Sequence, residues 1–355
     1  MKLPRFIWLL LPLSRVYGLI TDVRNWLFDS GLLAEYRPAR FTVSVGNLTV
    51  GGTGKTPLID YLIKRHVTSE WTLNHEIVTL SRGYGRRTTG YRLADDTDTA
   101  RTIGDEPLQL YRKFGHNVRV CVGERRADAI RIIQTRYPET TAILLDDAFQ
   151  HRAVQPHLNL LLTDYNRPCY LDHPFPAGRL RERRRGARRA DAVIVTKCPA
   201  DLSLTDKQLI SREIRRYARP KVPVFFAGLH YDQPMAFATQ QPAPGLREVL
   251  LVSGLANADS LECYVRQTFS MHRHYRFADH HAYTRADLDQ LLRLLPPGVG
   301  LLTTEKDRVK LDELLTPAER KTLPLFYLPV AMVFPGDDDA EFGRLLDAAA
   351  KMGRV

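Results

Sequence analysis

A glycine-rich segment places the strongest constraint on what this chain can fold into. It spans Val50–Pro57, reads VGGTGKTP, follows the apolar run Phe41–Val45 and precedes a helical pattern over Thr56–His66. Glycines let backbone N–H groups turn inward around phosphate oxygens, and the start of the next helix presents its positive end to the same anion. The strict motif has Gly where this chain has Thr49. The strand–loop–helix order still predicts a nucleotide site here.

The loop residues have separate tasks in such a site. Lys55 can reach the terminal phosphates, and the Thr56 hydroxyl can bind Mg²⁺. The predicted nucleotide-binding set is Gly51, Gly52, Thr53, Gly54, Lys55, Thr56 and Pro57.

Two carboxylates, Asp146 and Asp147, follow the apolar run Ile143–Leu145. Acids at the carboxyl edge of a parallel sheet often organise Mg²⁺, although such a pair can also mark only a turn. Next to a phosphate loop the metal role is favoured. Which of the two contacts the metal stays open.

Short apolar runs alternate with helical patterns from Phe41 to Lys197, which is typical of parallel βαβ units. Further helical patterns are Glu106–Phe114 and Glu124–Tyr137. The strand candidates are Phe41–Val45, Ile77–Leu80, Val118–Val122, Ala142–Leu145, Leu158–Thr163 and Ala192–Thr196. We expect an α/β fold with a three-layer, P-loop NTPase-type domain built on a parallel sheet.

At 355 residues the chain is long enough for about two domains. A Pro-rich passage separates a second part, with strand candidates Val249–Ser253, Gly300–Thr303 and Leu325–Leu328. We expect an N-terminal helical segment over 1–35, a P-loop core over 36–218, an extended linker over 219–245 and a smaller α/β domain over 246–355.

The N-terminus carries an apolar run, Phe6–Leu13, preceded by Lys2 and Arg5. Spanning a bilayer takes about 20 apolar residues, so this run is too short to cross one. Beyond it, apolar residues recur at spacings of three and four up to Leu27. We predict an interfacial, membrane-associated helix, with a core helix of the first domain as the alternative.

The net charge is +11, which implies an anionic partner. Seven arginines and Glu182 lie between Arg179 and Arg189, so this run supplies +6 of it. Nucleic-acid patches usually interleave aromatic residues and this run has none, so no nucleic-acid partner is expected. Beside an apolar helix, an anionic membrane surface or a phosphorylated substrate is favoured over a solvated loop.

Two absences narrow the class further. Thr196 and Lys197 begin the N/T-K-x-D element by which GTPases read guanine, but Pro199 stands where its Asp is needed, so ATP is expected. The cysteines form no C-x-x-C pair, which predicts a reducing compartment without a disulfide framework or zinc site. They are Cys121, Cys169, Cys198 and Cys263.

Six ordered segments carry a family resemblance. They are VGNLTVGGTGKTP (Val45–Pro57), SRGYGR (Ser81–Arg86), GDEP (Gly104–Pro107), LDDAFQHR (Leu145–Arg152), PAGRLRE (Pro176–Glu182) and FADHHAY (Phe277–Tyr283). Together they resemble the tetraacyldisaccharide 4′-kinases, the lipid A 4′-kinases. The resemblance implies Mg-ATP-dependent phosphorylation of the 4′-hydroxyl of tetraacyldisaccharide 1-phosphate, giving the 1,4′-bisphosphate (lipid IVA). It also implies a place at the cytoplasmic face of the Gram-negative inner membrane.

The resemblance implies roles for individual residues. Asp105 matches the proposed catalytic base and His280 the histidine that supports it, with Lys55 as the phosphate-loop lysine. The alternatives are a helix N-cap for Asp105 and a structural histidine for His280. The implied metal set is Thr56, Asp146, Asp147 and Glu182, and the implied substrate set is Arg82, Arg125, Gln150, His151 and Arg181.

The leading hypothesis is therefore a membrane-associated kinase that uses ATP and Mg²⁺ to phosphorylate an acylated disaccharide 1-phosphate. The alternative is a P-loop ATPase or switch protein that couples nucleotide hydrolysis to nucleic-acid or protein binding. A third hypothesis, a peripheral membrane adaptor, does not account for Lys55 and Asp147 together.

Overall fold

The computed structural model describes residues 7–68, 76–115 and 117–353. The chain forms two compact units, and neither is continuous in sequence. The first unit comprises the chain up to Arg82, Asn117–Leu229 and the C-terminal part from Met332. The second comprises Gly83–His116 and His230–Ala331.

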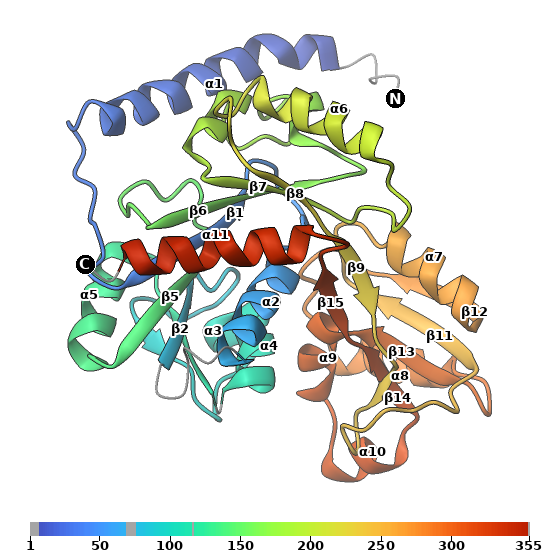
Figure 1. Cartoon of the computed structure of the whole chain (residues 1–355). Coiled ribbons are helices and arrows are strands. Elements are labelled where there is room, and N and C mark those ends of the chain that lie inside the picture. Colours follow the sequence, from blue (N-terminus) through green and yellow to red (C-terminus); the bar gives the residue numbers. More distant parts are fainter. Residues whose placement is uncertain (1–6, 69–75, 116, 354–355) are drawn as a thin grey trace. The chain divides into compact units, whose positions relative to one another are not determined.

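The first unit is built on a parallel sheet (Figure 1). Its strands in spatial order are β4 (Val118–Val122), β2 (Glu76–Ser81), β5 (Thr140–Asp146), β1 (Phe41–Asn47), β6 (Leu158–Asp164), β7 (Ala192–Thr196) and β8 (Val224–Phe226). Every residue of β1 is buried, as expected for a central strand covered on both faces. The predicted α/β class with a large parallel sheet is confirmed.

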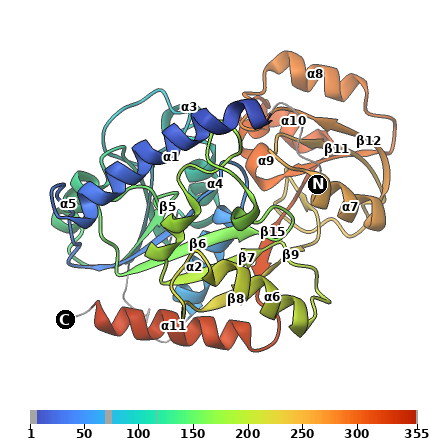
Figure 2. The ribbon, with the colours of Figure 1, turned by 90° about the horizontal axis from the view of Figure 1, so that it is seen from above.

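Helices cover both faces of this sheet. Figure 2 shows α2 and α11 on one side and α5 on the other. The helices of the unit are α1 (Ile7–Asp29), α2 (Lys55–Thr68), α5 (Arg126–Arg136), α6 (Leu204–Arg215) and α11 (Asp338–Met352), with 3₁₀ turns at Cys169–Leu171 and Arg184–Arg189.

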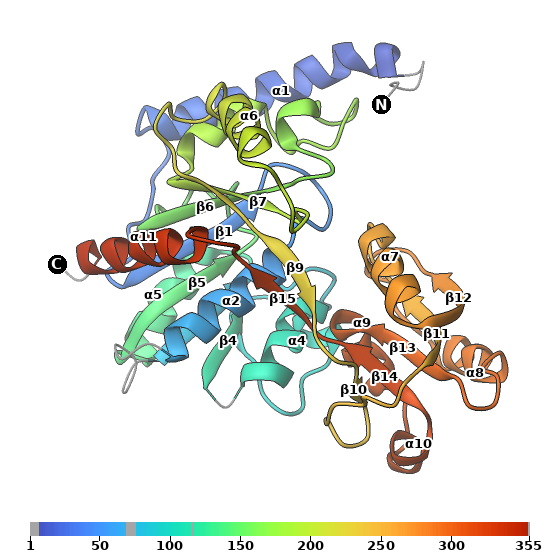
Figure 3. The same cartoon turned by 45° about the vertical axis from the view of Figure 1, so that its right-hand side comes forward.

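The second unit is a smaller α/β unit, seen from another side in Figure 3. Its strands in spatial order are β10 (Met235–Ala236), β14 (Leu325–Leu328), β13 (Gly300–Thr304), β11 (Glu248–Ser253) and β12 (Ser270–Arg276), and only the β10–β14 pair is antiparallel. Its other elements are β3 (Arg92–Leu93), α3 (Ala100–Ile103), α4 (Asp105–Phe114), α7 (Asp259–Thr268), α8 (Arg285–Arg293), α9 (Glu305–Asp312) and α10 (Pro317–Thr322).

The units correct the predicted domain boundaries. Residues 83–116 were expected in the P-loop core but belong to the second unit, because α4 packs against α9 and Lys113 pairs with Glu305 at 2.9 Å. The C-terminal helix was expected in the smaller domain but belongs to the first unit. Its fully buried Phe342 packs against Tyr61 of α2 and Phe225 of β8.

The predicted linker over 219–245 also contains regular structure. Strand β8 joins the first sheet and β10 joins the second, so the proline-rich composition marks short strands and turns within the linker. The chain passes between the units in β9 (Gly228–Tyr231) and β15 (Val330–Val333), which pair with each other.

Helix α1 turns an apolar face to solvent. Its exposed residues are Leu9, Leu13, Val16, Leu19, Ile20, Val23 and Trp26. Its polar side chains face the segment that contains the arginine run: the Ser14 hydroxyl donates to the carbonyl of Pro174, and Asp22 pairs with Arg183 and Arg185.

These exposed residues contradict the alternative of a core helix. Among the described helices, none combines the length and apolar character needed to cross a membrane. The predicted basic start, Lys2 and Arg5, and the first apolar residue, Phe6, lie outside the described residues.

Candidate active site

The loop between β1 and α2 has a conformation that glycine makes accessible. Gly51 and Gly54 lie at φ 112° and 84°, where a side chain would introduce strain. Helix α2 begins at Lys55, so the free N–H groups of its first turn lie next to the loop. The predicted phosphate loop therefore lies where the carboxyl end of a parallel strand meets a helix N-terminus.

Lys55 and Asp147 form an ion pair at this end of the sheet. The Lys55 ammonium lies 3.7 Å from Asp147 Oδ1, and Arg181 donates to the same oxygen at 2.7 Å. Burial raises the pKa of Asp147, but Lys55 and Arg181 outweigh it, so the pKa lies below its usual value and the carboxylate is ionised. The left-handed residue is Asp147 itself (φ 48°), and its neighbour Ala148 does not lie at positive φ.

Thr56, Asp146 and Asp147 fit a magnesium ion that arrives with a nucleotide. Asp146 is buried at the end of β5, and Thr56 lies in the first turn of α2. Within the described ranges, no three His, Cys, Asp or Glu side chains are placed to hold a metal by themselves. Mg²⁺ is usually held by one or two carboxylates together with phosphate oxygens, so this oxygen-donor set matches its needs.

Glu182, the fourth member of the predicted metal set, is hydrogen-bonded to the protein through both oxygens. Its buried carboxylate accepts two hydrogen bonds from Arg189, at 2.6 and 2.9 Å. It accepts two more from Asn25 of α1 and Gln150, at 2.8 and 3.1 Å. Through these bonds Glu182 connects α1 to the loop after β5, and its metal role stays a prediction.

The arginine run is largely neutralised by the protein itself. Asp22 is shared by Arg183 and Arg185, and the other acidic partners are Asp172 for Arg179, Asp147 for Arg181 and Glu182 for Arg189. Five of the seven arginines are thus paired with acids of the protein, and the predicted contact of the run with an anionic membrane surface or a phosphorylated substrate stays a prediction. Their guanidinium groups fasten α1, Asp147 and the chain between β6 and β7 together.

The segment after β5 is held close to β1. A Cβ on Gly46 would lie 2.7 Å from Phe149 Cβ, so only glycine allows this approach. Gln150 donates to the carbonyl of Asn47 at 2.9 Å and also contacts Glu182. The predicted substrate residues Gln150 and Arg181 thus lie together, 3.4 Å apart at their closest atoms.

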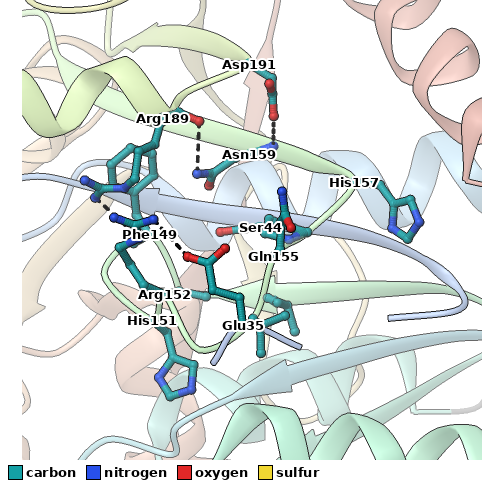
Figure 4. A pocket seen from close by; sticks show the side chains of 14 residues that line it. Glu35, Ser44, Phe149, His151, Arg152, Gln155, His157, Asn159, Arg189 and Asp191 are labelled. Atoms are coloured by element: carbon teal, nitrogen blue, oxygen red, sulfur yellow. Dashed lines mark hydrogen bonds and ion pairs between the residues drawn. The ribbon is translucent and has the colours of Figure 1, made fainter. Parts of the chain in front are cut away.

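His151 lines a cavity of about 390 Å³ in the first unit (Figure 4). Burial and the charges of Arg126, Arg24 and Arg82 lower the pKa of His151 to about 4, so its imidazole is neutral at pH 7. The predicted Arg82 is exposed at the end of β2 and acts on His151 electrostatically. Arg125 points into solvent, with 87% of its side chain exposed, and pairs with Asp128.

Asp105 and His280 form a second constellation, wholly within the second unit. Asp105 is the first residue of α4, and its carboxylate oxygens lie 2.9 and 3.1 Å from His280 Nδ1. Although His280 was expected to reach Asp105 from another domain, both belong to one unit. Asp105 also accepts a hydrogen bond from the backbone N–H of Glu106. It therefore binds both the first turn of α4 and His280.

Two lysines of α9 flank this pair. The ammonium groups of Lys306 and Lys310 both lie 3.8 Å from Asp105 Oδ2. Burial alone would raise the pKa of Asp105, but the His280 hydrogen bond and the lysines lower it to about 2. The same hydrogen bond raises the pKa of His280.

Comparison with known proteins places the chain in a family. The family model described as tetraacyldisaccharide-1-P 4′-kinase matches residues 6–351. The chain belongs to this family. A tetraacyldisaccharide 4′-kinase of Flavobacterium psychrophilum is 38% identical over 334 residues, covering 93% of each chain. One from Cytophaga hutchinsonii is 39% identical over 313 residues, covering 86% of each.

A solved structure shares the fold. A crystal structure of LpxK from Aquifex aeolicus in complex with ATP matches with a TM-score of 0.73 at 24% identity. The match covers 97% of this chain and 99% of that one. The arrangement of strands and helices is thus common to both proteins.

Sequence reasoning missed three cations of these two constellations. Lys306 and Lys310 stand four residues apart just after an apolar strand, so they share one face of a helix at the carboxyl edge of a sheet. That spacing is a signal which could have found them. Arg126 is buried and donates to the carbonyl of Asp146. In the sequence, only its position next to the predicted substrate residue Arg125 indicates a role at the site.

Proposed function

We propose that this chain transfers the γ-phosphoryl group of ATP to the 4′-hydroxyl of tetraacyldisaccharide 1-phosphate, producing the 1,4′-bisphosphate. Relatives named tetraacyldisaccharide 4′-kinase match over about nine-tenths of its length. The observation that carries the proposal is the phosphate loop with Lys55 paired to Asp147, on a chain of this family. The switch-protein alternative is not favoured, because the named relatives are kinases with a hydroxyl acceptor.

The first unit binds the nucleotide. The loop N–H groups and Lys55 hold the phosphates, and Thr56 with Asp146 or Asp147 holds Mg²⁺. Bound Mg²⁺ neutralises charge on the β- and γ-phosphate oxygens. When ATP binds, Lys55 exchanges part of its interaction with Asp147 for phosphate oxygens, and Arg181 keeps that carboxylate ionised.

The second unit supplies the base. Asp105 accepts the proton of the 4′-hydroxyl as the bond to phosphorus forms, and His280 orients the carboxylate through Nδ1. With a pKa of about 2, Asp105 is fully ionised at pH 7. Such a weak base suits a loose transition state, in which the proton leaves the hydroxyl late.

The glycolipid is bound by polar residues of the first unit. His151 stays neutral beside its cavity, so it can both donate to and accept from sugar hydroxyls. Arg82 and Arg125 are exposed cations suited to the 1-phosphate. Arg181 and Gln150 belong to the same substrate set and also hold the loop around Asp147.

The apolar face of α1 lies in the interfacial layer of a membrane, which for this acylated substrate is the cytoplasmic face of the Gram-negative inner membrane. The exposed apolar residues of α1 support an in-plane position. Their exposure in water would otherwise be unfavourable for a soluble chain.

An assay of nucleotide turnover with and without acceptor tests the function. We expect [γ-³²P]ATP to label tetraacyldisaccharide 1-phosphate in mixed micelles, with little hydrolysis in its absence. RNA-stimulated hydrolysis with no labelled lipid would favour the switch protein and overturn the kinase proposal.

A further inference from the structure

We propose that Thr196 and Lys197, at the end of β7, hold the phosphate loop in its ATP-binding conformation, with Lys197 as a positioning residue. This inference rests on the proposed nucleotide site. The two residues begin an element that in GTPases ends in a guanine-reading Asp, which this chain lacks. The proposed kinase mechanism assigns no role to either residue.

A phosphate loop has two sides. Its N–H groups face the anion, so its carbonyl groups turn outward, where each needs a hydrogen-bond donor when buried. The outward carbonyls of this loop find donors on the side chains of β7: Lys197 Nζ lies 2.6 Å from Gly52 O, and Thr196 Oγ1 lies 2.8 Å from Thr53 O.

The loop is also held from the end of β1. Asn47 donates to the Thr53 hydroxyl at 2.8 Å and approaches Gly51 O at 3.4 Å. Residues at the ends of two strands that β6 separates, β1 and β7, therefore hold three consecutive loop residues, Gly51, Gly52 and Thr53. Thr196 and Thr53 are both buried, so water does not replace the bond between them, whereas Gly52 is exposed and depends on Lys197 for its position.

Lys197 is itself held in an unfavourable conformation. It lies at φ 58°, in the left-handed region, where strain in a non-glycine residue persists only when the surroundings enforce it. Its ammonium pairs with buried Asp164 Oδ2 at 2.7 Å, and only 12% of its side chain is exposed. Because Asp164 neutralises it, Lys197 acts on the loop through geometry and adds little net charge.

Lys55 and Lys197 therefore have different functions at the nucleotide site. Lys55 meets the phosphates directly, whereas Lys197 sets the loop that carries the N–H groups. Removing Lys197 takes the ammonium donor away from Gly52 O and Asp164 Oδ2 and lets the loop change conformation. ATP affinity should fall, while binding of the glycolipid should not change.

Isothermal titration calorimetry with Mg-ATP on the full chain tests this without any acceptor. We expect Lys197→Met to weaken ATP binding at least about tenfold, and Lys197→Arg to recover part of it. The matched control is Lys207→Met, which removes another half-buried lysine, paired with Asp338 at 3.0 Å away from the loop, and should stay within about twofold of wild type.

Steady-state kinetics supply the second readout. We expect the KM for ATP to rise in Lys197→Met with the KM for glycolipid unchanged. If Lys197→Met does not fold, Thr196→Val removes the bond to Thr53 O, together with the longer contact to Thr163 O at 3.3 Å, and should still weaken ATP binding, by about threefold. ATP affinity equal to that of Lys207→Met, or an equal loss in both variants, would overturn the proposal. Because ATP binding needs no acceptor, failure of the kinase assay would leave this test intact.

Discussion

At the scale of single residues, the proposed sites combine ion pairs with unusual backbone conformations. Among the described residues, four non-glycine residues lie at positive φ, and Asp147, Lys197 and His280 are three of them. Such conformations cost free energy and cluster where surrounding structure enforces them. Asp147 and His280 belong to the proposed metal and base sites, and Lys197 contacts the phosphate loop.

Replacing Asp105 by Asn tests its role as base. The variant keeps the size of the side chain but removes the proton acceptor, so kcat should fall by about 10²- to 10⁴-fold. Mg-ATP affinity should stay unchanged in calorimetry. Asp312→Asn, which removes a partly exposed acid that pairs with Arg320 at the end of α9, is the charge-matched control, and near-normal kcat in Asp105→Asn would contradict the assignment.

The Asp105–His280 pair also predicts a pH-dependent stability. Its hydrogen bond raises the pKa of His280, so the folded chain holds that proton more tightly than the unfolded chain. This contribution is complete below the unfolded pKa of about 6.5 and is lost as pH rises through the folded pKa. His280→Gln should therefore lower the free energy of unfolding more at about pH 5.5 than at about pH 9 in urea titrations.

The same titrations in an Asp105→Asn background provide the control. Without the carboxylate partner, the effect of His280→Gln should no longer depend on pH in this way. A pH dependence that persists undiminished would assign it to other groups.

Residue types and spacing predicted much of the site, but not the partners of each charge. Lys55, Asp147, Asp105 and His280 carry recognisable motifs, and the structure pairs them as Lys55–Asp147 and Asp105–His280. For Glu182 only the fold reveals the partners of its oxygens, which are Arg189, Asn25 and Gln150, and its predicted metal role stays a prediction.

At the scale of elements, α1 has two faces with different tasks. Its polar side chains bind the segment that carries the arginines, chiefly through buried Asp22, and its apolar residues remain exposed. Periodicity predicted the apolar face. The acidic partners of the arginines could not be predicted, because Asp22 and Asp172 both lie outside the run in sequence.

Placing a charge on the exposed face of α1 should weaken membrane binding. We expect Leu13→Glu with Ile20→Glu to reduce co-sedimentation with phosphatidylglycerol-containing vesicles by about tenfold, since buried apolar area drives interfacial binding. Leu204→Glu, at an exposed leucine of α6, should have no effect. Equal binding of both proteins would place the membrane contact on another element.

At the scale of the whole molecule, the alternating pattern predicted two α/β units but not their boundaries. Local periodicity indicates strands and helices, whereas membership of a unit depends on packing between distant segments. Residues 83–116 join the second unit through α4 and α9, and α11 returns to the first unit through Phe342.

Truncating Phe342 tests that return. The side chain is fully buried against Tyr61, Phe225 and Phe334, so Phe342→Ala should lower the free energy of unfolding by about 3–5 kcal/mol. Chemical denaturation followed by circular dichroism measures the change. Leu209→Ala, on the exposed surface of α6, should change it by less than about 0.5 kcal/mol; an equally small change for Phe342→Ala would contradict the packing described.

The most direct test of the central claim is transfer of labelled phosphate by a pair of lysine variants of one helix. Lys55 begins α2 at the phosphate loop, and Lys64 lies on the same helix, paired with Asp60. With [γ-³²P]ATP and tetraacyldisaccharide 1-phosphate, the wild type and Lys64→Ala should form labelled 1,4′-bisphosphate, and Lys55→Ala should lose at least about 10²-fold in rate. Labelled lipid formed by Lys55→Ala at the wild-type rate, or no labelled lipid from the wild type, would contradict the account.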